Sequence, residues 1–241
     1  MSQQTGDASS PRAILEARGL CRNYDELVAL APLDLTIHAG ELVALVGPNG
    51  AGKTTLLMAA AGLLEPSKGT IYINGARAGS LRARAATSYI PDAPALYDDL
   101  SLNEHLEYIA GLHGAEDWSR RGQQLLERLG LAGWGDNLPS QYSRGMRQKA
   151  SIALGLVRPF SALLADEPFD GLDPSSRTAL VELLQEAAGG GAAVMVSTHR
   201  SEVGELADRC LALYDGELAY DGPPNEAVLA GFVPDAEEPG S

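Results

Sequence analysis

The segment Gly47–Thr54 constrains the fold of this chain more than any other part of its sequence. It reads GPNGAGKT and fits the pattern G-x-x-x-x-G-K-[ST] at every fixed position. An apolar run, Glu41–Val46, precedes it, and a helical pattern beginning near Lys53 follows it. In such a strand–loop–helix setting, backbone amides and the helix start form a cradle for phosphate groups. The segment therefore predicts an α/β fold with a P-loop NTPase core.

This loop predicts a set of phosphate contacts. The Lys53 side chain is placed to reach the β- and γ-phosphates of a nucleotide, and the Thr54 hydroxyl is placed to bind Mg²⁺. Further contacts are expected from the rest of the loop and the first residues of the helix: Gly47, Pro48, Asn49, Gly50, Ala51, Gly52 and Thr55.

Three apolar runs end in polar residues. Glu41–Val46 leads into the glycine-rich loop, residues 161–165 lead into Asp166–Glu167, and residues 192–196 lead into Ser197–His199. Continuous apolar runs are typical of parallel strands that are covered on both faces. Ligands of such sheets bind beyond the carboxyl ends of the strands, so we expect the three polar ends to meet at one site.

The residues at these strand ends suit phosphoryl transfer. Asp166 is placed to hold Mg²⁺, through a water molecule, and Glu167 can polarise the water that attacks the γ-phosphate. His199 can hydrogen-bond the γ-phosphate and orient Glu167, because its expected position is the neighbouring strand end. We therefore expect Lys53, Glu167 and His199 to act in catalysis, and we interpret the other histidines as structural: His38, His105 and His113.

Composition limits the other functions open to the chain. Its net charge of −14 argues against a broad nucleic-acid surface, which needs an excess of Lys and Arg. The two cysteines, Cys21 and Cys210, have no CxxC spacing and are expected to be lone thiols.

The start of the chain lacks a signal-peptide pattern, and no apolar run approaches the roughly 20 residues of a membrane helix. We expect the chain alone to be soluble and to reach a membrane only through a partner.

From about Ala13 to Pro223 the chain resembles the nucleotide-binding subunit of ATP-binding cassette (ABC) transporters. The segment YSRGM at 142–146 resembles the signature loop of that family, usually LSGGQ, with Ser143 and Gly145 at matching positions. Tyr142, Arg144 and Met146 depart from it. The segment PFDGLDP at 168–174 resembles the family loop that follows the acidic pair, which makes Asp173 its dimer-contacting aspartate.

Two further residues take roles from the resemblance. Tyr24 matches the aromatic residue that stacks on adenine. Asp92 stands where the family usually has a glutamine, and it is a candidate metal ligand. A carboxylate can approach Mg²⁺ but cannot donate a hydrogen bond, so the glutamine's full role does not transfer to Asp92.

The resemblance implies one domain at 12–223, with a mostly parallel sheet, an N-terminal antiparallel β subdomain and a helical subdomain at about 92–158 inserted in the core. Residues 1–11 and 232–241 are expected to be flexible ends. It implies ATP and Mg²⁺ as cofactors and a second copy of the cassette as a partner, with ATP held between the two copies. It also implies an ATPase that drives a separate transmembrane permease subunit from the cytoplasmic, inner face of the cell membrane.

The transporter subtype and the alternative functions are judged from smaller features of the sequence. The segments around Asp92 and Ser143 are similar to bacterial exporters of the drug, antibiotic and polysaccharide type. A soluble ABC-type ATPase acting on nucleic acid or ribosomes is a second interpretation, although the acidic charge and the single cassette disfavour it. A kinase or GTPase is a third, but it leaves YSRGM and STH unexplained, and the chain has no N-K-x-D guanine motif.

Overall fold

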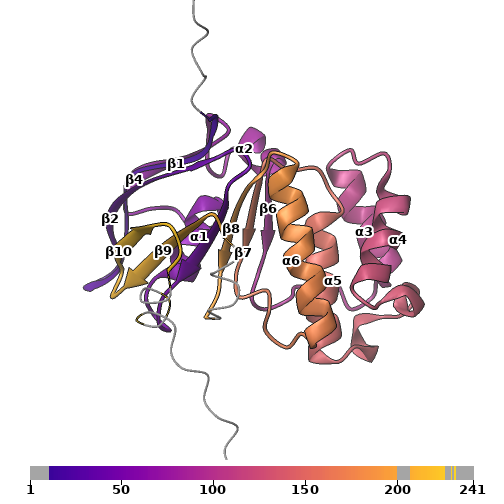
Figure 1. Cartoon of the computed structure of the whole chain (residues 1–241). Helices are drawn as coiled ribbons and strands as arrows, with labels where there is room; N and C mark the ends of the chain where they lie inside the picture. Colours follow the sequence, from indigo (N-terminus) through magenta and orange to yellow (C-terminus); the bar gives the residue numbers. More distant parts are fainter. Residues whose placement is uncertain (1–10, 200–206, 226–228, 230, 232–241) are drawn as a thin grey trace, which may run out of the picture.

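The computed structural model describes residues 11–199, 207–225, 229 and 231 (Figure 1). The expected flexible ends, at 1–11 and 232–241, lie outside these residues except for Pro11. In the described part of the chain, no helix is both long and apolar enough to cross a membrane.

Two sheets form the framework. The first has the order β2-β1-β4-β5 and is antiparallel. Its strands are β1 (Ala13–Tyr24), β2 (Leu27–His38), β4 (Lys68–Ile73) and β5 (Ala76–Arg77). The second has the order β10-β9-β3-β8-β7-β6, and it is parallel except for the edge strand β10. Its strands are β3 (Leu42–Val46), β6 (Thr87–Ile90), β7 (Ala162–Ala165), β8 (Ala193–Ser197), β9 (Arg209–Tyr214) and β10 (Glu217–Gly222).

The central strands of the second sheet are buried on both faces. Every residue of β3, β7 and β8 is buried. Successive side chains alternate between two cores: Ala162 and Leu164 of β7 pack with the first sheet, whereas Leu163 and Ala165 pack with the helices. This double coverage explains why these strands read as continuous apolar runs, and it confirms the expected α/β class.

Helix α1 (Lys53–Ala60) lies between the two sheets, directly after the glycine-rich loop (Figure 1). Its Leu56 and Leu57 are buried, as the helical pattern predicts. Leu63 lies beyond the end of this helix and is 58% exposed.

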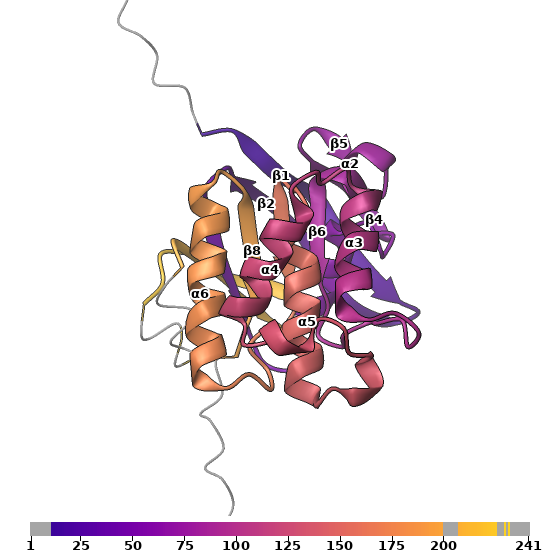
Figure 2. The same cartoon turned by 90° about the vertical axis from the view of Figure 1, so that its right-hand side faces the viewer.

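The opposite face of the parallel sheet is covered by helices (Figure 2). Helix α6 (Pro174–Gly189) packs beside α5 (Arg144–Leu156), with α3 (Leu102–Leu112) and α4 (Trp118–Arg128) outside them. Two 3-10 turns, η1 (Ala132–Trp134) and η2 (Pro139–Gln141), connect α4 to α5. The helices α3, α4 and α5 all lie between β6 and β7 in the sequence. Helix α2 (Leu81–Ala86) and β6 are short elements that the sequence patterns do not indicate.

Candidate nucleotide site

A pocket of about 280 Å³ opens beyond the carboxyl ends of β3 and β7. It joins residues that are far apart in the sequence, and these residues line it: Leu27, Val28, Ala29, Asn49, Gly50, Ala51, Gly52, Lys53, Thr54, Thr55, Asp92, Asp166 and Glu167. The structure thus brings the glycine-rich loop, the acidic pair and Asp92 together. Residues 27–29 of β2, next to the loop, also line the pocket, and the sequence motifs do not indicate this.

The glycine-rich loop can adopt its path only with glycine at certain positions. Gly47 and Gly52 have φ angles of 147° and 101°, in the region that disfavours other residues. A Cβ atom on Gly47 would clash with the carbonyl oxygen of Leu213, and one on Gly52 would lie 2.6 Å from that of Ala29. The fixed glycines of the motif are therefore explained by close packing against β2 and β9.

Lys53 is folded back onto its own loop. Its ammonium donates to the carbonyl oxygen of Gly47 at 2.7 Å and lies 3.4 Å from that of Pro48. The same ammonium lies 3.4 Å from Oε1 of Glu167, and both side chains are largely buried. The positive charge of Lys53 thus faces the acidic pair at Glu167.

The acidic pair has two different environments. Asp166 is 1% exposed; its Oδ1 accepts a hydrogen bond from the Ser197 hydroxyl at 2.7 Å, whereas its Oδ2 is buried and has no hydrogen-bond partner. Glu167 has the left-handed backbone angle φ 43°, a conformation that costs about 1–3 kcal/mol and is concentrated at functional sites. Its backbone N–H donates to the same Ser197 hydroxyl at 2.8 Å. Ser197 therefore fixes both acidic residues.

His199 lies beside Glu167, as the convergence of the strand ends predicts. Its Nδ1 is 3.0 Å from Oε2 of Glu167, and its Nε2 is 3.7 Å from Oδ1 of Asp170. Among the described residues, these three side chains are close enough together to be considered for a metal ion. Each of the two carboxylates has its short contact with a different ring nitrogen. Asp170 and Ser197 are also polar residues of the site, although the sequence motifs assign no individual role to either.

Asp92 lines the pocket from the segment after β6. Burial, and then the nearby charges of Asp166 and Asp170, raise the pKa of its carboxyl group above the ordinary value, while Arg144 acts in the opposite direction. The carboxylates of this site therefore repel one another, as expected where a divalent cation is to be bound.

Six of the expected site residues do not line this pocket: Gly47, Pro48 and His199, which lie next to lining residues, and Tyr24, Ser143 and Gly145. Tyr24, at the end of β1, is 43% exposed, and the guanidinium carbon of Arg22 lies 4.4 Å from the centre of its ring. Ser143 is the N-cap of α5, where its hydroxyl accepts from the backbone N–H of Met146 at 3.3 Å. Gly145 follows in the first turn of the same helix, and Ser143 is exposed.

Tyr142, which departs from the family pattern, has a structural explanation. Its ring is buried and packs edge-on against Trp134. Its hydroxyl donates to the carbonyl oxygen of Trp134 at 2.8 Å, with that of Asn137 at 3.2 Å. A leucine could fill this space but could not form the polar contact, so Tyr142 anchors the segment before Ser143 to the preceding turns.

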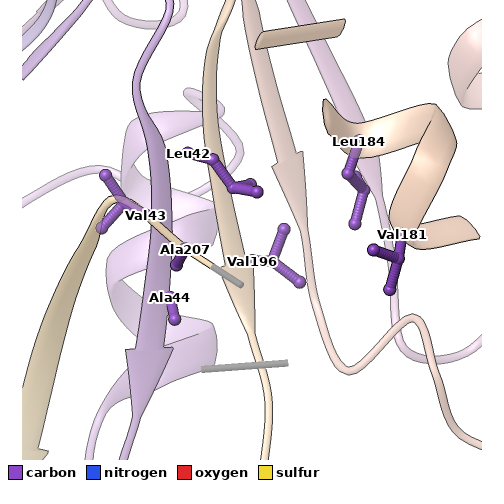
Figure 3. Close-up of a pocket in the computed structure, with 7 residues that line it drawn as sticks. All are labelled: Leu42, Val43, Ala44, Val181, Leu184, Val196 and Ala207. Carbon is purple, nitrogen blue, oxygen red and sulfur yellow. The ribbon is translucent and has the colours of Figure 1, made fainter. Parts of the chain in front are cut away.

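A second pocket, between β3, β8 and α6, has a different character (Figure 3). It is about 10 Å³, which is room for one water molecule, and only aliphatic side chains line it: Leu42, Val43, Ala44, Val181, Leu184, Val196 and Ala207. It offers no polar side chain for binding or chemistry.

The fold and the pocket together define a P-loop nucleotide-binding protein. The family model described as "ABC transporter" matches residues 30–170. The chain therefore belongs to the ABC transporter family. It is an ATP-binding subunit of that family and an ATPase.

Individual relatives agree with this assignment. The chain is 36% identical over 211 residues to the SkfA peptide export ATP-binding protein SkfE of Bacillus subtilis, covering 86% of this chain and 88% of SkfE. It is 38% identical over 220 residues to the probable multidrug ABC transporter ATP-binding protein YbhF of Escherichia coli. That match covers 88% of this chain but only 38% of YbhF, so the chain spans well under half of that relative's length.

A solved structure is similar over nearly the whole fold. It is the dimeric, post-hydrolysis state of the ATP-binding cassette MJ0796 bound to ADP and Pi, with a TM-score of 0.81 and 25% identity. The match covers 88% of this chain and 99% of the cassette. The expected P-loop core, with its antiparallel and mostly parallel sheets, is thereby confirmed.

Proposed function

We propose that this chain is the ATP-hydrolysing subunit of an ABC exporter, which drives a separate transmembrane permease by ATP-dependent pairing of two cassettes. The observation that carries the proposal is the arrangement of Lys53, Glu167 and His199: Lys53 and Glu167 line one pocket, and His199 contacts Glu167. A cation, a carboxylate held by its backbone and a histidine are what the transfer of a terminal phosphate to water requires.

We assign the chemical roles from the contacts of each side chain. Lys53 moves from its carbonyl partners to the β- and γ-phosphates, which are stronger acceptors. Glu167 accepts a proton from the attacking water as the water oxygen bonds to the γ-phosphorus and the bond to the ADP oxygen breaks. His199, with a proton on each ring nitrogen, orients Glu167 through the Nδ1 contact and donates from Nε2 to the γ-phosphate. The amides from Gly47 to Thr55 surround the phosphates, and Tyr24 stacks on the adenine.

A magnesium ion fits the acidic side of this pocket. The partnerless Oδ2 of Asp166 and the exposed Thr54 are the oxygen ligands that Mg²⁺ prefers, and Asp92 lies at the same pocket. When bound, Mg²⁺ neutralises charge that develops on the phosphate oxygens. The residues Thr54 and Asp166, with Asp92 at the edge, would hold it.

The second cassette completes each site. Ser143 and Gly145 do not line the pocket of their own chain, yet they begin a helix of 13 residues whose amides and dipole favour an anion. We infer that they bind the γ-phosphate of ATP held by a partner copy, with Asp173 contacting the partner nearby. The dimeric form of the MJ0796 cassette supports this arrangement.

The exporter and permease roles rest on relatives. SkfE is described as a peptide export protein and YbhF as a probable multidrug one. We propose that the helices α3–α5 and the segment around Asp92 contact the permease at the inner face of the cell membrane. No nucleic-acid partner is expected, because the net charge is −14.

Replacing Glu167 tests the chemical core of this proposal. Glu167→Gln keeps the shape of the side chain but removes its basicity, so the turnover of ATP should fall by about 10²–10⁴-fold. Binding of ATP should persist, because the loop amides and Lys53 are unchanged. Steady-state phosphate release and equilibrium ATP binding measure the two effects. Hydrolysis at the wild-type rate would assign the base to another residue.

A further inference from the structure

Asp170 is a charged residue of the nucleotide site that the proposed chemistry leaves unused. It lies three residues after Glu167, in the loop between β7 and α6, and its backbone N–H donates to the carbonyl oxygen of Glu167 at 3.1 Å. Its side chain is 33% exposed, and one of its oxygens lies 3.7 Å from Nε2 of His199. The turn at Glu167 therefore directs a second carboxylate to the histidine.

The groups expected to bind the terminal phosphate contact carboxylates of the same chain. Glu167 lies between the Lys53 ammonium at 3.4 Å and Nδ1 of His199 at 3.0 Å. Asp170 then faces the remaining nitrogen of His199. Both ring nitrogens thus already face an anion, and an incoming phosphate must replace one of them.

We propose that Asp170 is a positioning residue that faces Nε2 of His199 and is displaced from it by the terminal phosphate of ATP. This inference rests on the proposed function. At 3.7 Å the contact of Asp170 with a protonated His199 is a charge contact, too long for a hydrogen bond. A phosphate oxygen and the Asp170 carboxylate are both anionic and cannot occupy the same place beside Nε2. Since ADP lacks the terminal phosphate, it leaves the contact between Asp170 and His199 in place.

The loop that carries Asp170 also contacts the helix that begins at Ser143. Gly171, the next residue, approaches Gly145 so closely that a Cβ atom on Gly145 would lie 2.6 Å from the Gly171 carbonyl oxygen. Asp170 therefore adjoins a residue that packs against the first turn of α5.

The test compares two nucleotides and three variants of the full chain. Calorimetric titration with Mg²⁺ measures the Kd of ADP and of a non-hydrolysable ATP analogue. In Asp170→Asn, the ATP analogue should bind about two- to tenfold more tightly, the range expected for a partly exposed charge contact. The Kd of ADP should change less than twofold. Asp170→Ala should behave in the same way, and Asp170→Glu should restore the wild-type ratio of the two constants.

Glu107→Gln is the matched control, because it removes one negative charge from an exposed position on α3. It should leave both constants unchanged. An equal change for ADP and the ATP analogue in Asp170→Asn, or no change for either, would overturn the role of Asp170 while leaving the proposed function intact. A wild-type protein that binds neither nucleotide would overturn both.

Discussion

At the scale of single residues, the nucleotide site depends on one buried hydroxyl group. Ser197 donates to Asp166 and accepts from the backbone N–H of Glu167, so it connects the metal-binding candidate to the candidate base. It is fully buried at the end of β8. The left-handed backbone of Glu167 persists because this hydrogen bond, among others, holds it.

Ser197→Ala should therefore weaken both the site and the fold. It leaves the buried Oδ1 of Asp166 and the N–H of Glu167 without this partner, which costs about 1–3 kcal/mol of unfolding free energy. We expect ATP turnover to fall by about tenfold or more through misplacement of Glu167, because errors of about 1 Å in such groups have large effects. Urea unfolding and steady-state hydrolysis measure the two losses.

Thr178→Ala is a suitable control for Ser197→Ala, since it removes an exposed hydroxyl that contacts only the carbonyl oxygen of Pro174. Its stability and turnover should stay near those of the wild type. If Ser197→Ala retained full turnover and full stability, the hydroxyl would not be the element that fixes the acidic pair.

At the scale of elements, α5 and α6 are tied together near the site. The Lys149 ammonium of α5 lies 2.5 Å from Asp173, which is the N-cap of α6. Asp173 also accepts from the backbone N–H of Ser176 at 3.0 Å and from the Ser175 hydroxyl at 2.6 Å. These contacts, with that of Lys149 the largest, hold the pKa of the Asp173 carboxyl well below its usual value.

This low pKa predicts how stability depends on pH. A carboxyl group whose pKa is lower in the folded state stabilises the protein above its unfolded pKa of about 3.9, and this contribution is lost as the pH falls further. Asp173→Asn keeps a good N-cap but removes the charge. Its Tm at pH 7 should be about 1–4 °C below that of the wild type.

The difference in Tm between Asp173→Asn and the wild type should shrink as the pH is lowered from about 5 to 2, because the contribution of the charge is lost below the unfolded pKa. Lys149→Met removes the other charge of the pair and should give a similar loss at pH 7. Thermal unfolding followed by circular dichroism measures these values. A difference that stays constant over this pH range would mean that the charge of Asp173 does not contribute to stability.

The sequence predicted the meeting of residues that stand in a motif or at a strand end. The strand–loop–helix motif and the polar ends of three apolar runs led us to expect Lys53, Glu167 and His199 at one site, and these side chains lie together. Their catalytic roles stay predictions. Strand β6 was missed because only four residues form it and two of them, Thr87 and Ser88, are polar; the Ser88 hydroxyl is satisfied by the distant carbonyl oxygen of Gly155. Asp170 was missed as a site residue because it lies in the loop beyond the strand end, where no motif or periodic pattern marks its contact with His199.

At the scale of the whole molecule, the chain carries two surfaces that we assign to two different ATP molecules. The pocket at Lys53 and Asp166 is formed within one chain, whereas Ser143 is an exposed helix cap outside it. A second copy of the chain is therefore required, and ATP is held between the two copies. ATP then acts as a reversible link, because hydrolysis removes the terminal phosphate that the partner's helix binds.

Light scattering of the Glu167→Gln protein, with and without an added Ser143→Arg substitution, tests this claim most directly. With ATP and Mg²⁺, Glu167→Gln should double in mass, because the bound nucleotide persists. The double variant should bind ATP yet remain a monomer, because the arginine blocks the helix start that receives the partner's γ-phosphate. A dimer that forms equally well in the double variant, or a Glu167→Gln protein that stays monomeric when saturated with ATP, would contradict the account.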